Sequence, residues 1–308
     1  MTGASGFIGC CAVRRLLADG ADVHLFVRPD ADTWRLTDIL DDVCVHRVDL
    51  ADAGTVEAAV RKSAPGAVVH LATYGAYEWQ ADNRRILETN VLGSLNLLQA
   101  SLGAGVRVFV NAGSSSEYGY KKEAMRETDR LEPNSVYAVA KAAQTHLASL
   151  MGGRGEMSTT TFRLFSVYGP WEEPNRLMPT VIRRAQAGLP LEMAAPDTAR
   201  DFVYVDDVLD AMLGFDRLRA TNAQVFNLGS GVQSTLRDVV DAVVAVAGSR
   251  SEVRWGAMAA RRWDTNRWQA DTSKARTVLG WTPRHALRDG IARMAQWMEK
   301  AGGAYATA

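Results

Sequence analysis

The stretch that decides the fold is GASGFIG, residues Gly3 to Gly9, in which glycine recurs at every third position. Glycines at a turn from a strand into a helix let the backbone approach a pyrophosphate, whose charge then lies at the helix N-terminus. The spacing alone is weak evidence, because turns are rich in glycine. Its context strengthens it: an apolar-periodic segment follows from Cys10 to Leu17, and Val23 to Val27 is typical of a buried strand.

The strand that should precede this turn is missing, because the sequence begins where that strand would end. Loss of a central parallel strand would leave its two neighbours with unpaired backbone groups in the interior. We therefore expect about six further apolar residues upstream in the natural product, the length of a short strand. The upstream gene sequence tests this expectation, and an in-frame stop codon immediately before Met1 would contradict it.

Strands and helices alternate through the first half of the chain. Strands are expected at 43–48, 67–71, 106–110 and 159–164, and helices at 55–62, 85–102 and 136–150. This alternation predicts an α/β fold with a Rossmann-like, doubly wound parallel sheet over residues 1–168. Shorter strands are expected at 189–193, 202–205, 225–227 and 252–255. We interpret residues 169–300 as a smaller C-terminal substrate lobe, with residues 200–230 returning to the first domain and 301–308 forming a disordered tail.

The composition argues against several classes of protein. Of the 308 residues, 47% are hydrophobic and 23% are charged, which is ordinary for a globular protein. Lys plus Arg equals Asp plus Glu at 35 each, so no overall charge favours nucleic acid or a membrane surface. Cys10, Cys11 and Cys44 have neither a metal-binding spacing nor a disulfide framework, which is typical of a reducing cytoplasm.

The chemistry is expected in SVYAVAK, residues Ser135 to Lys141. A tyrosine and a lysine four residues apart lie on one face of a helix. A cation beside the phenol stabilises the phenolate and lowers the tyrosine pKa from about 10, which makes it a proton donor and acceptor near neutral pH. A lysine extended along a half-exposed helix face is the alternative, and it explains the pair better if the pair is taken alone.

Further motifs follow one another along the chain. They are Asp49-Leu50, His70-Leu71-Ala72, Asn90, Ser114 to Ser116, Arg163 to Pro170, Arg200 to Asp207, Asn227 to Gly231 and Asp271 to Trp281. With the glycine turn and the Tyr137–Lys141 pair, the chain resembles the extended short-chain dehydrogenase/reductase family. More narrowly, it resembles the nucleotide-sugar epimerase/dehydratase branch of that family, over nearly its whole length.

The resemblance implies a catalytic trio. Ser114 corresponds to the Ser or Thr that hydrogen-bonds the reacting sugar oxygen, Tyr137 to the acid/base, and Lys141 to the residue that binds the nicotinamide ribose. Ser114 also follows a predicted strand at the carboxyl edge of the sheet, where ligands bind in open α/β folds. Without Tyr137, a polar turn would explain the serine cluster better. The resemblance also implies cofactor contacts at Gly3, Gly6, Phe7, Ile8, Gly9, Asp49, Leu50, Leu71, Ala72 and Asn90, as well as at Tyr137 and Lys141.

The end of the second strand departs from the family pattern. NAD-binding members carry an acidic residue there for the ribose 2′-hydroxyl, whereas this chain has Val27 followed by Arg28. Loss of the carboxylate removes repulsion against a 2′-phosphate, and a guanidinium can bind that phosphate through two hydrogen bonds. NADP is therefore expected as the cofactor, with NAD possible. The alternative is that Arg28 is a solvated charge at the start of a loop.

A second departure concerns dehydration. Sugar 4,6-dehydratases carry an Asp-Glu pair directly after the catalytic Thr, and this chain has Ser115 and Ser116 there. A hydroxyl cannot replace a carboxylate in that acid/base role. Glu117 lies one position later, so a shift of the backbone could restore the assignment. We expect instead that dehydration is not the reaction and that Ser115 and Ser116 contact substrate.

The remaining substrate contacts are carried over from relatives. Ser166 replaces an Asn that contacts the nucleotide diphosphate, and a serine can still donate one hydrogen bond. Arg200 and Arg261 match positions that contact the nucleotide phosphates, with Asp264 near the nucleoside. An exposed basic turn is the alternative for Arg261. The resemblance also implies a homodimer through a four-helix bundle, and no metal is expected.

These observations predict a cytoplasmic oxidoreductase that acts on a nucleotide-diphosphate sugar. We expect an NADPH-dependent 4-ketoreductase of a nucleotide-linked 4-keto-6-deoxyhexose. A nucleotide-sugar 4-epimerase is the alternative, because it uses the same three residues. A non-catalytic NADP-sensing or RNA-associated protein is the remote alternative, since a fold does not fix a function.

Overall fold

The computed structural model describes residues 1–155, 157–259 and 265–302. The chain forms two compact units, each built from several segments. The first comprises Met1–Gly119, Glu127–Leu164 and Leu209–Phe226. The second comprises Tyr120–Arg126, Phe165–Val208 and Asn227–Ala308.

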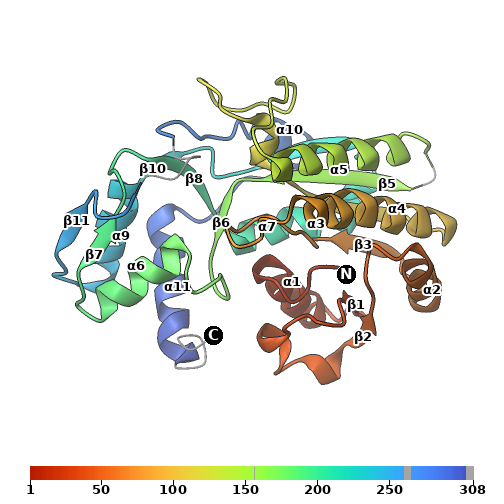
Figure 1. The fold of residues 1–308 in the computed structure, drawn as a ribbon, viewed down its shortest axis with the longest axis horizontal. Helices are drawn as coiled ribbons and strands as arrows, with labels where there is room; N and C mark the ends of the chain where they lie inside the picture. The colour runs from red at the N-terminus through yellow and green to blue at the C-terminus, as the bar shows by residue number, and fades with distance from the viewer. Residues whose placement is uncertain (156, 260–264, 303–308) are drawn as a thin grey trace. The chain divides into compact units, whose positions relative to one another are not determined.

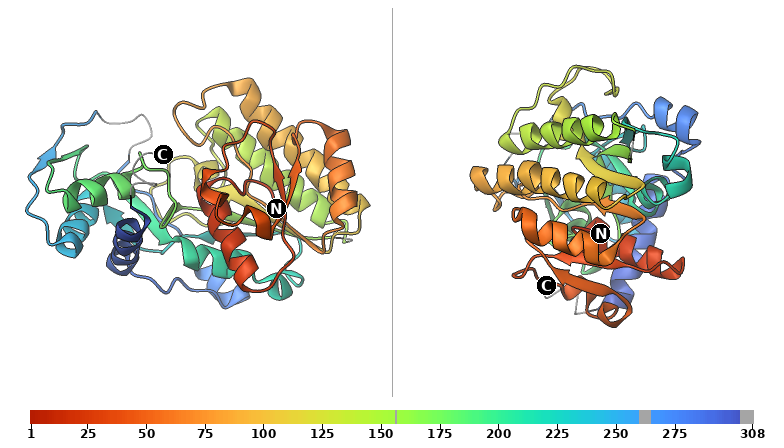
Figure 2. Two further views of the ribbon diagram at one scale, coloured as in Figure 1. Left: turned by 90° about the horizontal axis from the view of Figure 1, so that it is seen from below. Right: turned by 90° about the vertical axis from the view of Figure 1, so that its right-hand side faces the viewer.

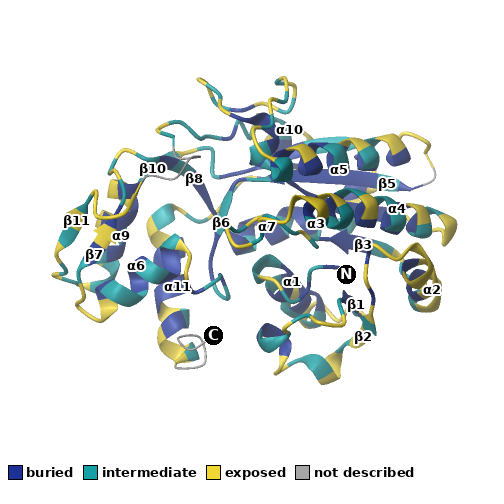
Figure 3. Ribbon diagram, viewed as in Figure 1, coloured by how far each residue is buried: buried dark blue, intermediate teal, exposed yellow. Residues whose placement is uncertain are grey.

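The first unit contains the expected parallel strands (Figure 1). Their bounds are β1 His24–Val27, β2 Cys44–Arg47, β3 Ala67–His70, β4 Val108–Ser114, β5 Ser158–Leu164 and β9 Gln224–Leu228. Strand β1 pairs with β2 in parallel, and the other four lie in the order β3-β4-β5-β9, with β3, β4 and β5 parallel to one another. β4 is buried from Val108 to Gly113. The strand β5 beside it is likewise mainly buried, shown dark blue in Figure 3. β4 ends four residues later than the sequence predicted, so that Ser114 is its last residue.

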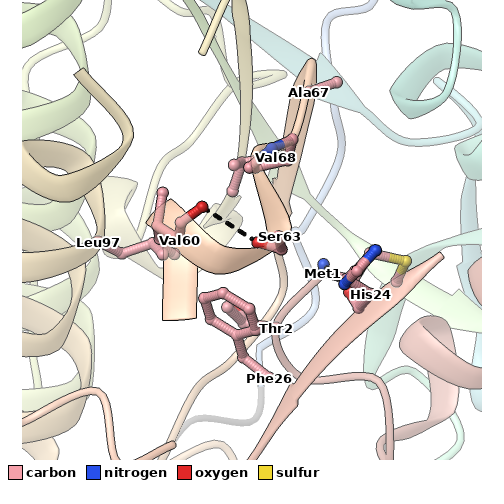
Figure 4. Close-up of a pocket in the computed structure, with 10 residues that line it drawn as sticks. Met1, Thr2, His24, Phe26, Val60, Ser63, Ala67, Val68 and Leu97 are labelled. Atoms are coloured by element: carbon pink, nitrogen blue, oxygen red, sulfur yellow. Dashed lines mark hydrogen bonds between the residues drawn. The ribbon is translucent and has the colours of Figure 1, made fainter. Parts of the chain in front are cut away.

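Residue Thr2 lies where the missing strand was expected. It forms parallel bridges to Phe26 of β1 and to His70 of β3. The Phe26 N–H donates to the Met1 carbonyl at 2.8 Å, and the Thr2 N–H donates to Val69 O at 3.0 Å. Next to these residues lies a pocket lined mainly by the starts of β1 and β3 and by α2 (Figure 4).

Helices alternate with the strands of the first unit. Their bounds are α1 Phe7–Ala18, α2 Ala53–Ser63, α3 Asn83–Leu87, α4 Gly93–Gly103, α5 Val136–Gly152 and α8 Phe215–Leu218, with short 3-10 helices at Trp34–Leu36, Leu40–Asp42 and Ser115–Tyr118. Helix α4 contacts both α2 and α5, and α4 and α5 run side by side in Figure 2. Asp52 caps α2, and Ser135 caps α5 by accepting the Ala138 N–H at 3.1 Å.

The long helix expected at 85–102 is interrupted. A π-helical segment, Glu88–Leu92, separates α3 from α4. A π turn inserts an extra residue into the helical repeat, and such turns are frequent at functional sites. Here it carries the buried Asn90. The prediction of one continuous helix was therefore wrong at this point.

The second unit contains short strands and amphipathic helices. The bounds are β6 Ser166–Tyr168, β7 Leu191–Met193, β8 Ala199–Tyr204, β10 Gln233–Thr235, β11 Val253–Trp255, α6 Leu177–Gln186, α7 Val205–Met212, α9 Leu236–Ala247, α10 Ser273–Leu279 and α11 Leu287–Ala301. The strands form a β10-β8-β6 sheet and a β11-β7 pair. Helix α11 continues to Ala301, and the expected tail beyond Gly302 lies outside the described residues. Across the described part of the chain, none of the helices has both the length and the apolar character needed for a membrane span.

Candidate active site

The glycine turn packs tightly against neighbouring backbone at two of its three glycines. Gly3 has a φ of +70°, and a Cβ on it would lie 2.5 Å from Ala72 N. A Cβ on Gly9 would lie 2.1 Å from Gly3 O, so both glycines are required by packing. A Cβ on Gly6 would meet nothing closer than Gly3 O at 3.4 Å, and no side chain caps α1. The turn and the first residues of α1, Phe7 and Ile8, therefore fit a pyrophosphate.

The three residues predicted to be catalytic come from two neighbouring elements. Ser114 ends β4, and Tyr137 and Lys141 lie in the first two turns of α5. Helix α5 packs against both β4 and β5. Ser114 lies close enough to the Tyr137 phenol to lower its pKa through hydrogen bonding, so the structure brings the predicted serine and tyrosine together.

Thr73, a residue that the sequence did not indicate, also acts on the phenol and lowers the Tyr137 pKa. Burial raises the pKa of the Tyr137 phenol, and the hydrogen bonds from Ser114 and Thr73 only partly oppose it. Glu117 and Tyr77 raise it further by charge repulsion. The expected lowering of this pKa by Lys141 is not seen, because burial dominates.

Lys141 is directed away from the phenol. Its ammonium donates to Ala112 O at 2.5 Å and to Gln144 Oε1 at 2.6 Å. Gln144 in turn donates to Asn111 Oδ1 at 2.7 Å. Burial lowers the Lys141 pKa to about 8, so the side chain is largely charged at neutral pH. Among its described contacts two of three N–H donors are used, which leaves one for a ligand hydroxyl such as a ribose.

Both carboxylate oxygens of Glu117 are hydrogen-bonded within the fold. Glu117 is completely buried, and its Oε1 accepts from the Ser114 N–H at 2.8 Å and from Thr145 Oγ1 at 3.1 Å. Its Oε2 accepts from Arg163 Nε at 2.8 Å. The shifted assignment of Glu117 as a dehydratase carboxylate is therefore wrong: both oxygens are held within the fold. Ser116 Oγ lies 2.7 Å from Ser114 Oγ, whereas Ser115 is buried.

Asn90 and His70 support the loop after β3. Asn90 Nδ2 donates to Tyr74 O at 2.7 Å, and its Oδ1 accepts from Tyr74 N at 2.9 Å. His70 is completely buried, and its ring nitrogens lie 2.7 Å from Thr2 Oγ1 and 2.8 Å from Ser94 Oγ. Burial lowers the His70 pKa to about 3, so this imidazole is neutral.

Basic side chains surround the end of β1. Arg28 is partly exposed, and its Nε lies 3.8 Å from Asp30 Oδ1. Arg85 Nη2 lies 3.8 Å from Asp30 Oδ2, and Arg47 Nη1 donates to Arg28 O at 3.3 Å. Within this cluster of four side chains, three guanidinium groups face one carboxylate.

The other predicted cofactor residues lie at the ends of β2 and β3. Asp49 Oδ1 accepts from Ala51 N at 2.9 Å, and Leu50 is buried against Gly93. The Leu71 and Ala72 N–H groups both donate to Thr2.

The predicted nucleotide contacts that the structure describes belong to the second unit. Ser166 begins β6, and Arg200 lies in β8 with its guanidinium 5.7 Å from the Trp268 ring centre. The neighbouring Asp201 accepts from the backbone N–H groups of Ser230, Gly231 and Ala270. Arg261 and Asp264 lie outside the described residues.

A parallel α/β unit with a glycine turn, a strand-end serine and a Tyr-x-x-x-Lys helix defines a Rossmann-fold oxidoreductase of the short-chain dehydrogenase/reductase type. The sequence match of residues 1–229 to the "NAD dependent epimerase/dehydratase family" is in accord with this class. The chain belongs to that family.

Individual relatives are similar over nearly their whole length. The UDP-glucose 4-epimerase of Mycolicibacterium smegmatis is 30% identical, over 96% of this chain and 97% of that protein. The dTDP-glucose 4,6-dehydratase of Streptomyces antibioticus is 29% identical, over 96% and 91%. The structure of MoeE5 in complex with UDP-glucuronic acid and NAD superposes with a TM-score of 0.84, at 32% identity, over 97% and 98% of the two chains.

Proposed function

We propose that this protein is an NADPH-dependent 4-ketoreductase of a nucleotide-linked 4-keto-6-deoxyhexose. The observation that carries the proposal is the Ser114–Tyr137 pair at the carboxyl edge of β4, in a site whose nearest carboxylate, Glu117, is buried in an ion pair. Such a site can hydrogen-bond a carbonyl oxygen and protonate it. Among the described residues, the one carboxylate that acts on Tyr137 is Glu117, whose oxygens are already bonded, and this argues against dehydration.

Ser114, Tyr137 and Lys141 have separate roles in the proposed reaction at C4. The glycine turn would hold the pyrophosphate of a nicotinamide dinucleotide, and that cofactor would supply the hydride for C4. Ser114 donates a hydrogen bond to the C4 oxygen, and Tyr137 donates a proton to it. Lys141 holds the nicotinamide ribose through the N–H donor that its described contacts leave unused.

NADP is favoured by the charge at the end of β1. Val27 and Arg28 replace the acidic residue that would bind a ribose 2′-hydroxyl, and Arg47 and Arg85 lie nearby. A charge-assisted hydrogen bond contributes about 1.5–3 kcal/mol, or roughly tenfold or more in affinity. We expect Arg28→Ala to weaken NADPH binding by about that factor with little effect on NADH. Arg61→Ala, in α2, is the control, and equal losses for both cofactors would contradict the assignment.

A nucleotide-sugar 4-epimerase is the second candidate. It is favoured by relatives such as the UDP-glucose 4-epimerase of Mycolicibacterium smegmatis. An epimerase oxidises C4 and reduces it from the other face, so it consumes no cofactor overall.

The two candidates are separated by the balance of cofactor. The protein is mixed with NADPH or NADH and with a panel of 4-keto and unmodified sugar nucleotides, and the absorbance of reduced nicotinamide is followed. A reductase consumes one NADPH for each 4-keto sugar reduced. An epimerase converts unmodified sugar nucleotides without net loss of that absorbance. Absence of both reactions across the panel would overturn the proposal.

A further inference from the structure

A buried row of polar side chains joins helix α5 to strands β4 and β5, against which it packs (Figure 1). The Lys141 ammonium donates to Gln144 Oε1 at 2.6 Å, and Gln144 Nε2 donates to Asn111 Oδ1 at 2.7 Å. Asn111 Nδ2 in turn donates to Thr161 Oγ1 at 3.1 Å, across a register pair of the sheet. All four residues are at most 2% exposed, so a polar group that loses its partner here stays without one.

The lysine sets the direction of the hydrogen bonds in this row. An ammonium can only donate, so the Gln144 amide presents its oxygen to Lys141 and its NH2 group to Asn111. The Asn111 amide then presents its oxygen to Gln144 and its NH2 group to Thr161. Each amide is held by a partner at both ends, and the Gln144 oxygen is thereby fixed beside the ammonium.

Two neutral oxygens hold the Lys141 ammonium. Besides Gln144 Oε1, the acceptor is the backbone carbonyl of Ala112, at 2.5 Å. A neutral dipole orients an ammonium without cancelling its charge, whereas a carboxylate at the same place would form an ion pair with it. Two of the three N–H donors are occupied in this way, and the charge and the third donor remain for a ligand.

Among the described residues, no carboxylate is paired with Lys141. The Glu117 carboxylate after β4 raises the Lys141 pKa, but it is already bonded to Arg163 of β5 at 2.8 Å. The His70 ring of β3 is neutral, because burial lowers its pKa to about 3. Tyr137, one turn earlier on α5, stays protonated at neutral pH because burial raises its pKa. In the described part of the chain, Gln144 is thus the side chain that hydrogen-bonds the ammonium.

We propose that Gln144 is a positioning residue, which holds the Lys141 ammonium in place for the cofactor, and that Asn111 keeps the Gln144 oxygen turned toward the lysine. The inference rests on the proposed role of Lys141 at the nicotinamide ribose, and Gln144 acts through the lysine. The Gln144 side chain therefore influences two measurable quantities, the Lys141 pKa and the affinity for the dinucleotide.

The first test is the titration of Lys141 in the full chain without ligand. The Cε resonances of labelled lysines are followed by NMR against pH, and the Lys141 resonance is the one absent from Lys141→Met. Gln144→Leu removes an acceptor of the charged form at similar volume, so the Lys141 pKa should fall below its wild-type value of about 8. Gln144→Glu places a carboxylate there, so the pKa should rise above that value.

The second test is the affinity for NADPH and NADH, measured by calorimetry. Both cofactors carry the nicotinamide ribose, so Gln144→Leu should weaken the binding of both by roughly tenfold, the contribution of a hydrogen bond to a charged group. Gln144→Glu should restore most of this affinity, because it again holds the ammonium. Arg28→Ala, in contrast, is expected to weaken NADPH binding alone.

Thr159→Val is the matched control. Thr159 of β5 is buried and donates to Ala148 O of α5 at 2.8 Å, so this substitution removes a buried hydrogen bond between the helix and the sheet that does not involve Lys141. It should change neither the Lys141 pKa nor the affinity for either cofactor.

The proposal is overturned by an unchanged Lys141 pKa in Gln144→Leu and Gln144→Glu, or by an equal shift in Thr159→Val. If Gln144→Leu does not fold, Gln144→Glu decides by the same criterion. A shifted pKa with unchanged cofactor affinity would also overturn the proposal, because the lysine would then not be held for the cofactor. If the wild type binds neither NADPH nor NADH, the proposed function fails, and the titration still decides whether Gln144 holds Lys141.

Discussion

Two hydroxyl side chains of different exposure, Ser114 and Thr73, act on the Tyr137 phenol. The sequence indicated Ser114, because it follows an apolar strand in a recognisable motif. It did not indicate Thr73, because only the fold brings a loop residue 64 positions earlier to the phenol. Side chains that meet across elements leave no periodic signal in the sequence.

Lys141 shows the limit of spacing as evidence. Two residues four apart on a helix share a face, but the direction of a long side chain depends on its partners. Here the Lys141 ammonium is buried and donates to the Ala112 carbonyl and to Gln144. Tyr137 and Lys141 lie on one helix as predicted, but the predicted lowering of the Tyr137 pKa by the lysine is not seen.

The buried ion pair between Glu117 and Arg163 should contribute strongly to the stability of the fold. Both side chains are buried, and Glu117→Gln would leave the Arg163 charge without its partner. Removal of one partner of a buried ion pair typically costs about 3–5 kcal/mol. We expect a large fall in the urea concentration at the midpoint of unfolding. Glu57→Gln is the control, because its ion pair with Arg61 is exposed and contributes little. Similar small effects of the two substitutions would contradict the structural role of Glu117.

Among the elements, the segment Glu88–Leu92 differs most from expectation. The apolar periodicity of 85–102 predicted one helix, and the structure inserts a π turn that carries the buried Asn90. The apolar pattern of this stretch did not reveal the insertion, which displaces the helical repeat by one residue. The strands of the first unit and its helices α1, α2 and α5 were predicted to within about four residues, since buried strands and amphipathic helices have strong patterns. The short helix α8 and the 3-10 helices were not predicted.

His70, the last residue of strand β3, should make the stability of the protein depend on pH. It bridges Thr2 and Ser94 as a neutral ring, with its pKa lowered to about 3 by burial. Between pH 6.5 and 3 the unfolded chain binds a proton at this position that the folded chain does not. Stability should therefore fall as pH decreases through this window, by up to about 1.4 kcal/mol per pH unit.

Denaturation at several pH values measures this slope. His70→Gln should have a shallower decline than wild type, because the group that binds the extra proton is gone. His146→Gln, on the exposed face of α5, controls for the loss of an imidazole. An unchanged acid slope in His70→Gln would refute the assignment of this linkage to His70.

At the scale of the whole molecule, strand–helix alternation and ordered motifs were enough to predict the fold class and the family. The substrate could not be predicted in the same way. Its expected contacts are single residues in irregular segments, such as Ser166 and Arg200, where no pattern distinguishes a ligand contact from a solvated side chain. The predicted cofactor preference likewise depends on few residues, and its test is the comparison of NADPH with NADH.

The central claim is that Tyr137 provides the proton for hydride transfer at C4. It is tested most directly by the turnover of Tyr137→Phe on the 4-keto sugar nucleotide that the wild type reduces. The substitution keeps the ring and removes the hydroxyl on which Ser114 and Thr73 act. The account predicts a fall of about 10²- to 10⁴-fold in the rate of reduced-nicotinamide consumption, with cofactor binding retained. Full turnover by Tyr137→Phe would contradict it.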